Sequence, residues 1–482
     1  MAGIPEIQRE EILQQFPFEH GTLPVRYLGL PLLTRRMTSS DYLPLIEKIK
    51  SQISSWTVKA LSFAGRLQLI RSVIFSLTNF WIAAFRLPKA CIQEIDKLCS
   101  SFLWSGPSMN PRKVKVAWTE VCTPKNEGGL GLRSIEEANK VSVLKLIWRI
   151  LSAKGSLWVE WVKKYLIRKG SFWAVKGTTT CGSWIWKKLL KYRGIAQQFY
   201  RVEVKNGETT SFWFDQWSNI GCLYEILGKR GCIDLGISVT ATVGEVMSMN
   251  RRKKHRQDLL NTVENAIKGQ KLAQQNDETD IGLWKGRNDH HRNVFNSKET
   301  WMQIRNTRPL MEDYKGIWFP YSTPKYSFIT WLVAKNRVAT GARILKWNRQ
   351  ADSSCIFCQD PMETREHLFF LCPFSFQVWR ELAMGILTTD FTASWRDVLK
   401  LIQGNDLGKT KCFILRYIFQ NAIHSIWRER NNRRHGEDHS TSMRLVKMID
   451  QNIRNRLSTI QSGGDSKYAG GIQFWFQSRQ QF

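Results

Sequence analysis

Three cysteines and one histidine lie close together in the C-terminal third of the chain. Cys355, Cys358, His367 and Cys372 form the pattern C-x2-C-x8-H-x4-C. Zn²⁺ prefers thiolate and imidazole ligands, and four protein ligands leave no open coordination position for a substrate or an activated water. The sequence therefore predicts one structural Zn²⁺ site. The alternative is that buried cysteines happen to lie beside an unrelated histidine.

The residues around this cluster fit a compact metal-binding turn. Polar Asp352–Ser354 precede the first two cysteines, and Gln359–Pro361 turn the chain back after them. His367 opens an apolar run that ends at Cys372, so the last two ligands can converge from one helical turn and its end. Pro373 follows, and proline is favoured at the first position of a helix. We therefore expect a helix to start directly after the fourth ligand.

Helical spacing of apolar residues occurs on both sides of the cluster. Before it, one helix follows Pro324 and includes Trp331, and Thr340 caps a second helix that runs to Trp347. After it, the apolar residues between Cys412 and Arg430 predict a long helix with a basic end. These helices are expected to pack on the cluster.

The composition indicates a folded, strongly basic protein. Hydrophobic residues make up 43% of the 482 residues, and the 21 Trp and 25 Phe exclude a largely disordered chain. The formal net charge is +30, from 71 Lys plus Arg against 41 Asp plus Glu. This excess favours a polyanionic partner, and nucleic acid is the first candidate.

Basic residues recur beside aromatic ones, as in Trp186-Lys187-Lys188 and Trp427-Arg428, and do not form one basic tail. This pattern suits phosphate contacts flanked by stacking rings. The alternative is a set of solvated helix faces over a Trp-rich core. The candidates for phosphate contact before the cluster and at the end of the long helix are Lys335, Arg337, Arg343, Lys346, Arg428 and Arg430.

The ten cysteines do not form a pattern typical of secreted proteins, because six of the seven outside the cluster are scattered before residue 240. This predicts a reducing compartment, the nucleus or cytoplasm, and no secretion. The first residues do not look like a secretory leader, and no run of 18 apolar residues occurs, so no membrane partner is expected. Arg251–Arg256 is basic enough to act as a nuclear import signal.

Composition shifts divide the chain into five predicted regions. Residues 20–152 are expected to be mainly helical, with short strands over Val25–Leu30 and Val114–Trp118 and a glycine turn at Gly128–Gly131. The remaining regions are an aromatic-rich mixed region at 153–244, a polar linker at 245–310, the metal cluster with its following helices at 311–435, and a helix with a loose tail at 436–482. The expected fold class is α-rich, multidomain α+β, with a small zinc-stabilised helical C-terminal domain.

Several segments of the chain, taken in order, resemble the C-terminal part of reverse transcriptases from plant LINE-type non-LTR retrotransposons. The segments that carry this resemblance are Leu23–Pro31 (end of the polymerase palm), Trp56 with Ser62–Arg66 (start of the thumb), Phe102–Trp104 and Gly128–Gly131 (its continuation), Ser211–Trp217 (middle region) and Pro324–Cys372 (zinc-binding domain). The resemblance implies a thumb-like region at 20–152, a reverse-transcriptase zinc-binding domain at 311–435, and RNA or DNA as the partner.

The resemblance does not imply catalysis by this chain. The family's polymerases hold two metal ions with adjacent aspartates in an aromatic-x-Asp-Asp motif, and no two aspartates are adjacent in this sequence. An upstream endonuclease and the spaced carboxylates of a ribonuclease H are not recognisable either. We therefore expect a fragment without enzymatic activity that binds nucleic acid, with the rest of a retrotransposon reverse transcriptase as a further partner.

A protein-interaction module is the alternative function. In that hypothesis the apolar residues Ile356, Phe357, Phe369 and Phe370 dock a partner, and the excess charge only keeps the chain soluble. The two hypotheses differ in salt dependence, because phosphate contacts weaken steeply as the salt concentration rises and an apolar interface does not.

Overall fold

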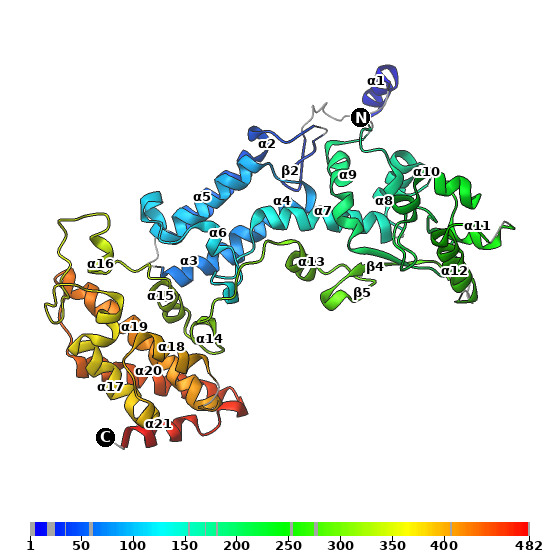
Figure 1. Ribbon diagram of the computed structural model, residues 1–482. Helices are drawn as coiled ribbons and strands as arrows, with labels where there is room; N and C mark the ends of the chain where they lie inside the picture. The colour runs from blue at the N-terminus through cyan, green and yellow to red at the C-terminus, as the bar shows by residue number, and fades with distance from the viewer. Residues whose placement is uncertain are drawn as a thin grey trace. The chain divides into compact units, whose positions relative to one another are not determined.

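The computed structural model describes residues 5–16, 25–33, 35–56, 61–152, 155–168, 170–179, 182–250, 254–273, 278–404 and 407–480. Helices dominate these residues, and the few strands form one two-stranded and one three-stranded antiparallel sheet (Figure 1). The prediction of an α-rich chain with a minor β component is therefore confirmed.

The chain separates into two compact units, and each unit is built from three segments. Unit 1 contains Met1–Lys48, Leu77–Gln93 and Ile135–Arg305. Unit 2 contains Ile49–Ser76, Glu94–Ser134 and Asn306–Phe482. This division corrects the predicted layout, because parts of the 20–152 region belong with the C-terminal residues and not in a thumb-like body of their own.

Up to residue 152 the helical periodicities predicted from the sequence are confirmed. The helices here are α1 (Glu6–Gln15), α2 (Ser39–Ser55), α3 (Phe63–Leu69), the π-helix η1 (Ile70–Ile74), α4 (Phe75–Ala84), α5 (Lys89–Ser105), α6 (Trp118–Val121) and α7 (Ile135–Ser152), with short 3-10 turns η2 (Gly106–Ser108), η3 (Pro111–Lys113) and η4 (Lys125–Glu127).

The two strands predicted in this part have different outcomes. The first is a tight hairpin of β1 (Arg26–Tyr27) and β2 (Leu30–Pro31), whose two turn residues have positive φ. Leu23 and Pro24, which were part of the resemblance, lie outside the described residues. The strand predicted over Val114–Trp118 is wrong, because Trp118 begins α6 and its indole N–H donates a hydrogen bond to Asp96 at 2.8 Å.

Unit 1 contains a Trp-rich core beside a three-stranded sheet. β3 (Tyr200–Glu203) pairs with β4 (Ile281–Lys285), and β4 pairs with β5 (His291–Arg292). Trp284 on β4 is 1% exposed and stacks on Phe199 with ring centroids 5.4 Å apart. The helices of unit 1 after α7 are α8 (Leu157–Trp161), the π-helix η5 (Val162–Ile167), η6 (Phe172–Ala174), α9 (Trp184–Gln197), α10 (Leu223–Leu235), α11 (Val243–Ser248), α12 (Asp258–Ala273), η7 (Arg287–Asp289) and α13 (Ser297–Ile304).

The predicted polar linker at 245–310 is wrong for the described residues of that range. α12 buries Leu260, Val263 and Ile267 in the core of unit 1, and β4 is the central strand of the sheet. The buried stripe has only about one large apolar residue per turn, and polar segments flank the helix on both sides, so composition alone concealed it. The first three residues of the predicted import signal, 251–253, lie outside the described residues.

Unit 2 is a helical bundle arranged around the long helix α19 (Lys409–Arg434). Helices α15 (Pro324–Ala334), α17 (Pro373–Leu387) and α20 (Ser442–Ser462) pack on it. Proline occupies the first turn of both α15 and α17, as predicted. The other helices of this bundle are α14 (Tyr314–Ile317), α16 (Gly341–Ile344), the π-helix η8 (His367–Leu371), η9 (Thr388–Asp390), α18 (Trp395–Gln403), η10 (Ser466–Tyr468) and α21 (Gly471–Gln480).

Aromatic contacts attach α15 to earlier segments of the chain. Phe328 stacks on Phe63 with ring centroids 5.2 Å apart, and Trp331 stacks on Trp104 at 6.4 Å. The indole N–H of Trp331 also donates to the carbonyl oxygen of Gly128 at 2.9 Å. Gly128 has φ +83°, which side chains rarely adopt, so the predicted glycine turn is confirmed.

The end of the chain is ordered up to residue 480, so the predicted loose tail is wrong there. α21 carries Trp475, which is fully buried and donates its indole N–H to the carboxylate of Asp450 at 2.8 Å. The glycines near residue 463 separate α20 from the last helices and do not prevent them from packing.

One helical stretch among the described residues, Phe63–Ala84, is long and apolar enough to cross a membrane. Core helices of folded proteins have the same length and apolarity. Arg66 and Arg71 in this stretch donate hydrogen bonds to the carbonyl oxygens of Leu103 and Leu130. We assign no span to it, and the absence of a membrane partner stays a prediction.

Candidate metal centre

The structure brings the four predicted ligands together. The ligand atoms of Cys355, Cys358, His367 and Cys372 all lie within 4.8 Å of one another. The sulfurs of Cys355 and Cys372 are 3.8 Å apart, and the Cys358 sulfur is 3.2 Å from His367 Nε2. Two sulfurs bound to one tetrahedral Zn²⁺ at about 2.3 Å are separated by about 3.8 Å. The donor set and its spacing therefore fit a single Zn²⁺.

A tight turn positions the first two ligands. The backbone N–H of Cys355 donates to the carbonyl oxygen of Asp360, and the N–H of Gln359 donates back to Cys355, both at 2.8 Å. Gln359 has φ +62°, which lets the chain reverse directly after Cys358. The second cysteine thus lies at the outer end of the turn, and the buried Cys355 lies at its base.

A π-helical turn and the helix after it position the other two ligands. η8 begins at His367, whose backbone N–H donates to Thr364 Oγ1 at 3.1 Å. Cys372 is the residue before α17, and Pro373 takes the first helical position, as predicted. Phe369 and Phe370 on η8 are buried. They anchor the turn in the core, so they cannot dock a partner as the protein-interaction hypothesis requires.

Hydrogen bonds inside the cluster favour thiolate at Cys355. A hydrogen bond shared with the Cys372 sulfur lowers the pKa of Cys355 to about 4, with help from the backbone N–H groups of Phe357 and Cys358. The same bond, together with burial, raises the pKa of Cys372. A bound Zn²⁺ stabilises every coordinating thiolate, so metal binding would release the remaining thiol protons.

The imidazole of His367 is oriented for binding through Nε2. Its other nitrogen, Nδ1, faces the carboxylate of Asp360 at 3.8 Å. At this distance the carboxylate makes no direct hydrogen bond, and its charge favours the tautomer with the proton on Nδ1, which leaves Nε2 free. Asp360 therefore belongs to the metal centre, although it lies in the part of the sequence that we expected to form only a turn.

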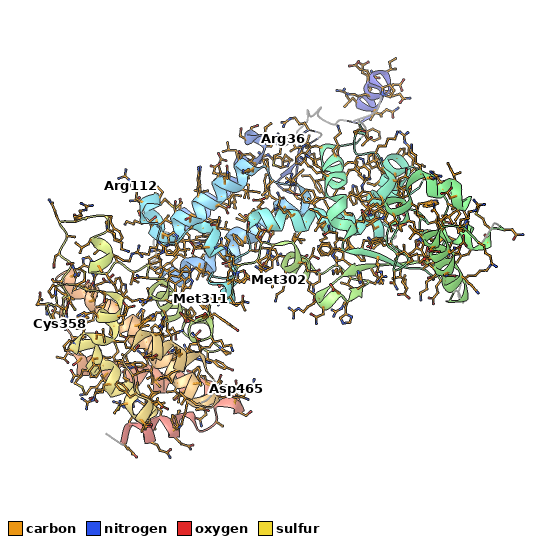
Figure 2. The ribbon with its side chains drawn as sticks, in the orientation of Figure 1. Arg36, Arg112, Met302, Met311, Cys358 and Asp465 are labelled. Atoms are coloured by element: carbon orange, nitrogen blue, oxygen red, sulfur yellow. The ribbon has the colours of Figure 1, made fainter. Side chains whose placement is uncertain are left out.

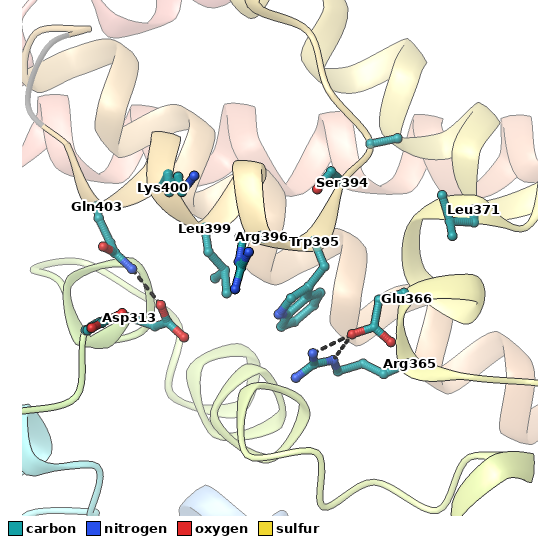
Figure 3. A pocket seen from close by; sticks show the side chains of 12 residues that line it. Asp313, Arg365, Glu366, Leu371, Ser394, Trp395, Arg396, Leu399, Lys400 and Gln403 are labelled. Carbon is teal, nitrogen blue, oxygen red and sulfur yellow. Dashed lines mark hydrogen bonds and ion pairs between the residues drawn. The ribbon is translucent and has the colours of Figure 1, made fainter.

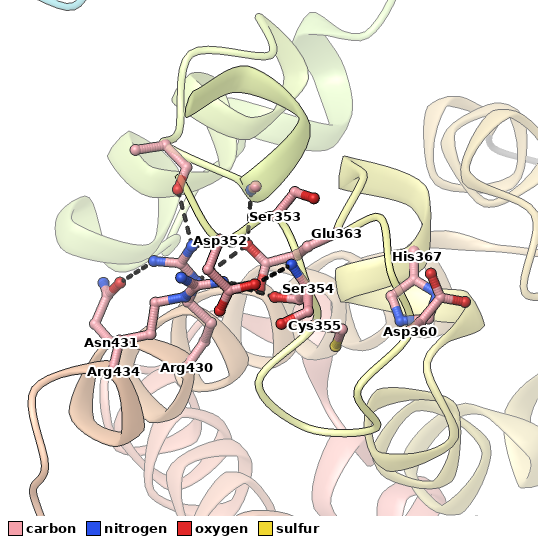
Figure 4. Close-up of polar contacts among 12 residues, drawn as sticks. Asp352, Ser353, Ser354, Cys355, Asp360, Glu363, His367, Arg430, Asn431 and Arg434 are labelled. Carbon is pink, nitrogen blue, oxygen red and sulfur yellow. Dashed lines mark hydrogen bonds and ion pairs between the residues drawn. The ribbon is translucent and has the colours of Figure 1, made fainter. Parts of the chain in front are cut away.

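A buried ion pair supports the metal-binding loop from α19. Arg430 binds the carboxylate of Glu363, with its closest contact at 2.7 Å, and both side chains are at most 5% exposed (Figure 4). Glu363 also accepts a hydrogen bond from the backbone N–H of Gly341, and Arg434 donates to the carbonyl oxygen of Ser354 at 2.7 Å. The loop is thus tied to both α16 and α19.

Arg433 also supports the metal-binding loop, through contacts with two aromatic rings. Its guanidinium lies 4.9 Å from the ring centroid of Phe357 and 4.7 Å from that of Phe374. These two rings stack on each other at 4.4 Å. One turn of α19 therefore fixes the cysteine turn and the start of α17 together, a role that the sequence did not reveal because these residues are far apart in the chain.

The six predicted phosphate contacts have different environments. Arg337, Lys346 and Arg428 are exposed, and Arg343 is half-buried. Lys335 pairs with Glu120 at 3.1 Å and is mostly covered. Arg430 cannot reach a phosphate, because its guanidinium is buried against Glu363. This corrects the prediction for Arg430, whose charge stabilises the fold.

Lys115 and Trp347, which were not among the predicted contacts, lie near Arg343. Lys115 follows η3, in which Arg112 is exposed (Figure 2). Burial lowers the pKa of Lys115, and the nearby charge of Arg343 lowers it further. Burial and the charge of Arg337 in turn lower the pKa of Arg343. The Arg343 guanidinium lies 5.4 Å from the ring centroid of Trp347, which is 60% exposed. No local pattern predicts this convergence, because the two segments meet only in the folded chain.

A pocket of about 580 Å³ lies beside the ligand-bearing segment, next to α18 (Figure 3). Both acidic and basic residues line it, and they bind one another: Arg365 contacts Glu366 and lies 4.4 Å from the ring centroid of Trp395, and Gln403 donates to Asp313 at 2.6 Å. Arg365 also donates to the carbonyl oxygen of Ala334. The last contact joins the residues just before η8 to the end of α15. We assign no ligand to the pocket.

Comparisons with known proteins agree with the metal centre. Residues 295–379 match the family described as zinc-binding in reverse transcriptase. An Arabidopsis thaliana protein named as a putative ribonuclease H protein is 26% identical over 369 residues, which are 73% of this chain and 57% of the relative. An uncharacterized mitochondrial protein of Arabidopsis thaliana is 26% identical over 145 residues, which are 30% of this chain and 92% of that protein. No solved structure matches the chain.

The matched family and the geometry point to the same residues. All four ligands lie inside the range 295–379, and one Zn²⁺ accounts for them. The chain spans 57% of the length of the first relative. The activity in that protein's name is therefore not assigned to this chain. This chain therefore carries a reverse-transcriptase zinc-binding domain with one Cys₃His site, and its relatives are typical of retrotransposon-derived proteins.

Proposed function

We propose that the chain binds RNA or DNA through a basic surface of unit 2, which consists of Lys115, Arg337, Arg343, Lys346 and Trp347. The observation that carries this proposal is the convergence of Lys115, Arg337 and Arg343 from two distant segments. None of these cations forms an ion pair within the described part of the chain. Like charges held together without acids repel one another, and phosphate groups relieve that repulsion.

The exposed ring of Trp347 adds a second type of contact. Its position under Arg343 leaves one side of the indole accessible to solvent. Aromatic rings next to cations bind nucleic acids by stacking on bases while the cations contact phosphates. The surface therefore suits unpaired nucleotides better than a smooth duplex.

The metal would act on this surface through the fold. α16, which carries Arg343, is attached to the metal-binding loop because Gly341 donates to Glu363. A Cβ at Gly341 would lie 2.3 Å from the carbonyl oxygen of Ser353, so this approach requires glycine. Release of Zn²⁺ should therefore disorder α16 and displace Arg343 and Trp347. The proposed role is binding, because four protein ligands leave no position for a reacting group.

The test compares two double variants of the full chain. A fragment is unsuitable, because α15 packs on Phe63 and Trp104. Arg337→Gln with Arg343→Gln should weaken binding of a labelled 20-nucleotide RNA, measured by fluorescence anisotropy between about 50 and 200 mM salt. The slope of log affinity against log salt should fall by about 1.4, or about 0.7 for each lost phosphate contact on a single strand.

The control removes two exposed charges elsewhere in unit 2. Arg444→Gln with Lys447→Gln on α20 changes the net charge by the same amount. If both double variants lose affinity equally, the net charge of the chain and not this surface is responsible. Unchanged affinity in the Arg337 and Arg343 variant would refute the proposal.

The same proposal includes partners and location. We place the chain in a reducing compartment, the nucleus or cytoplasm, and support this with the nine described cysteines, none of which forms a disulfide. The rest of a reverse transcriptase is a further proposed partner, in keeping with the matched zinc-binding family. Immunofluorescence of the tagged full chain, and co-purification with a separately expressed polymerase segment, test these two points.

A further inference from the structure

We infer that unit 1 carries a separate stacking platform for single-stranded nucleic acid on the continuous helix formed by α8 and η5. The aromatic platform is defined as Trp161 and Tyr165 with the cations Lys164 and Arg168. It uses none of the residues of the basic surface in unit 2, so it does not depend on the function proposed above.

This helix has two apolar faces, although one is enough to attach it. Val159 and Val162 are 1% and 2% exposed and pack into unit 1. On the other face Leu157 is 84% exposed, Trp161 50% and Tyr165 52%. Exposed apolar groups of this size, spaced at successive helical turns, mark an interaction site and not a requirement of the fold.

The rings on the exposed face are arranged as a surface on which bases can stack. Trp161 and Tyr165 have ring centroids 5.7 Å apart and planes inclined by 35°. The Lys164 ammonium lies 5.7 Å from the Tyr165 ring centroid, and Arg168 is held by a hydrogen bond from Nε to the carbonyl oxygen of Tyr165. Lys164 therefore lies over one side of the Tyr165 ring, and Arg168 lies beside the backbone of the same residue.

The positive charge around the rings favours a polyanionic ligand. Lys163, Lys164 and Arg168 are exposed, and none forms an ion pair within the residues that the structure describes. Glu160 is the single acid between 157 and 168. A flexible polyanion with accessible flat bases satisfies both the rings and the cations, whereas a duplex keeps its bases stacked internally. A lipid surface also binds tryptophan and lysine, so it is the competing occupant that the experiment must exclude.

The test measures binding of the full chain to labelled oligo(U) and to a hairpin duplex of equal phosphate number. Trp161→Ala with Tyr165→Ala should weaken oligo(U) binding at least about tenfold, because each base stacked on an aromatic ring contributes roughly fivefold to a hundredfold. The salt slope should not change, since no cation is removed. Trp161→Phe with Tyr165→Phe should restore most of the affinity, because the rings remain.

Matched controls separate this platform from general effects. Tyr27→Ala removes a 66% exposed ring elsewhere in unit 1 and should leave affinity unchanged. The Arg337 and Arg343 variant should lower the salt slope, so failure of one site can be distinguished from failure of the other. Photo-crosslinking of oligo(U) containing 4-thiouridine should label the peptide containing Trp161.

Three results would overturn the inference. The first is equal oligo(U) affinity for the alanine variant and the unmodified chain, with thermal melting showing that both are folded. The second is an equal loss of affinity for oligo(U) and duplex. The third is sedimentation of the chain with phosphatidylserine-containing vesicles that depends on Trp161 and Tyr165 when oligo(U) binding does not, which would assign the platform to a lipid surface.

Discussion

The metal centre of unit 2 and the Trp-rich core of unit 1 are stabilised by different forces. Around the metal centre, four ligands, the buried pair of Glu363 with Arg430, and the stacked Arg433 hold short loops in place. In unit 1, rings such as Trp284 pack against one another beside a small sheet. The first region depends on charge and metal, whereas the second depends on apolar area, so the two should respond differently to the same perturbation.

Metal removal should give the largest difference between the two regions. Cys358→Ser, or a chelator, removes coordination that contributes on the order of 10 kcal/mol in small zinc units. We expect hydrogen exchange to rise sharply over residues 341–374 while the β3–β4 peptides of unit 1 remain protected. Cys232→Ser is the control, because Cys232 is a half-exposed cysteine outside the cluster. An equal rise of hydrogen exchange in both regions would show that metal removal does not distinguish them.

Truncation of a core ring should reverse the pattern. Trp284→Ala removes a 1% exposed indole and its hydrogen bond to Thr300, and large-to-small changes of this kind cost about 4 kcal/mol. Protection of the sheet peptides should fall while the zinc content stays at one per chain. Trp161→Ala, at a half-exposed ring, should cost well under about 1 kcal/mol. Loss of zinc from the Trp284→Ala chain would contradict the assignment.

Removal of one partner of the buried ion pair should have a smaller but specific effect. Glu363→Gln keeps the shape of the side chain and leaves the Arg430 charge unpaired, which costs about 3 kcal/mol. Zinc should then be released at lower chelator concentration. Asp397→Asn breaks the exposed pair with Lys400 and should change unfolding free energy by less than about 1 kcal/mol. Equal effects of both variants would show that burial of the pair is unimportant.

Mild acid should change the stability of the two units gradually and with opposite signs. Burial and the charges of Lys325 and Arg428 lower the pKa of His424 to about 4, so unit 2 loses stability as the pH falls from about 6.5 through 4. Burial raises the pKa of Asp215 to about 6, so unit 1 gains stability as the pH falls from about 6 towards 3.8. Each effect is at most about 1.4 kcal/mol per pH unit.

Hydrogen exchange of both units between pH 4 and 7 measures these slopes. His424→Gln should remove the His424 contribution from unit 2 and leave the separate acid sensitivity of the zinc thiolates. Asp215→Asn should flatten the response of unit 1. If unit 1 also loses stability over this pH range in the unmodified chain, Asp215 does not dominate its response.

Sequence alone determined the features that depend on nearby residues. The four metal ligands lie within 18 positions, so their types and spacing define one site before any folding is considered. Helix α19 and the proline starts of α15 and α17 follow from local periodicity and from the backbone limits of proline. These features can be predicted because each depends on residues that are close together in the sequence.

Tertiary structure alone decided the pairings between distant segments. Arg430 was expected at the surface, yet Glu363 neutralises it in the core, and Lys115 meets Arg343 only after the segments fold together. β4 and α12 looked like a polar linker because their few apolar residues acquire meaning only against β3 and the core of unit 1. A local sequence pattern does not show which distant segment will pack against it, because burial and charge neutralisation depend on both surfaces in contact.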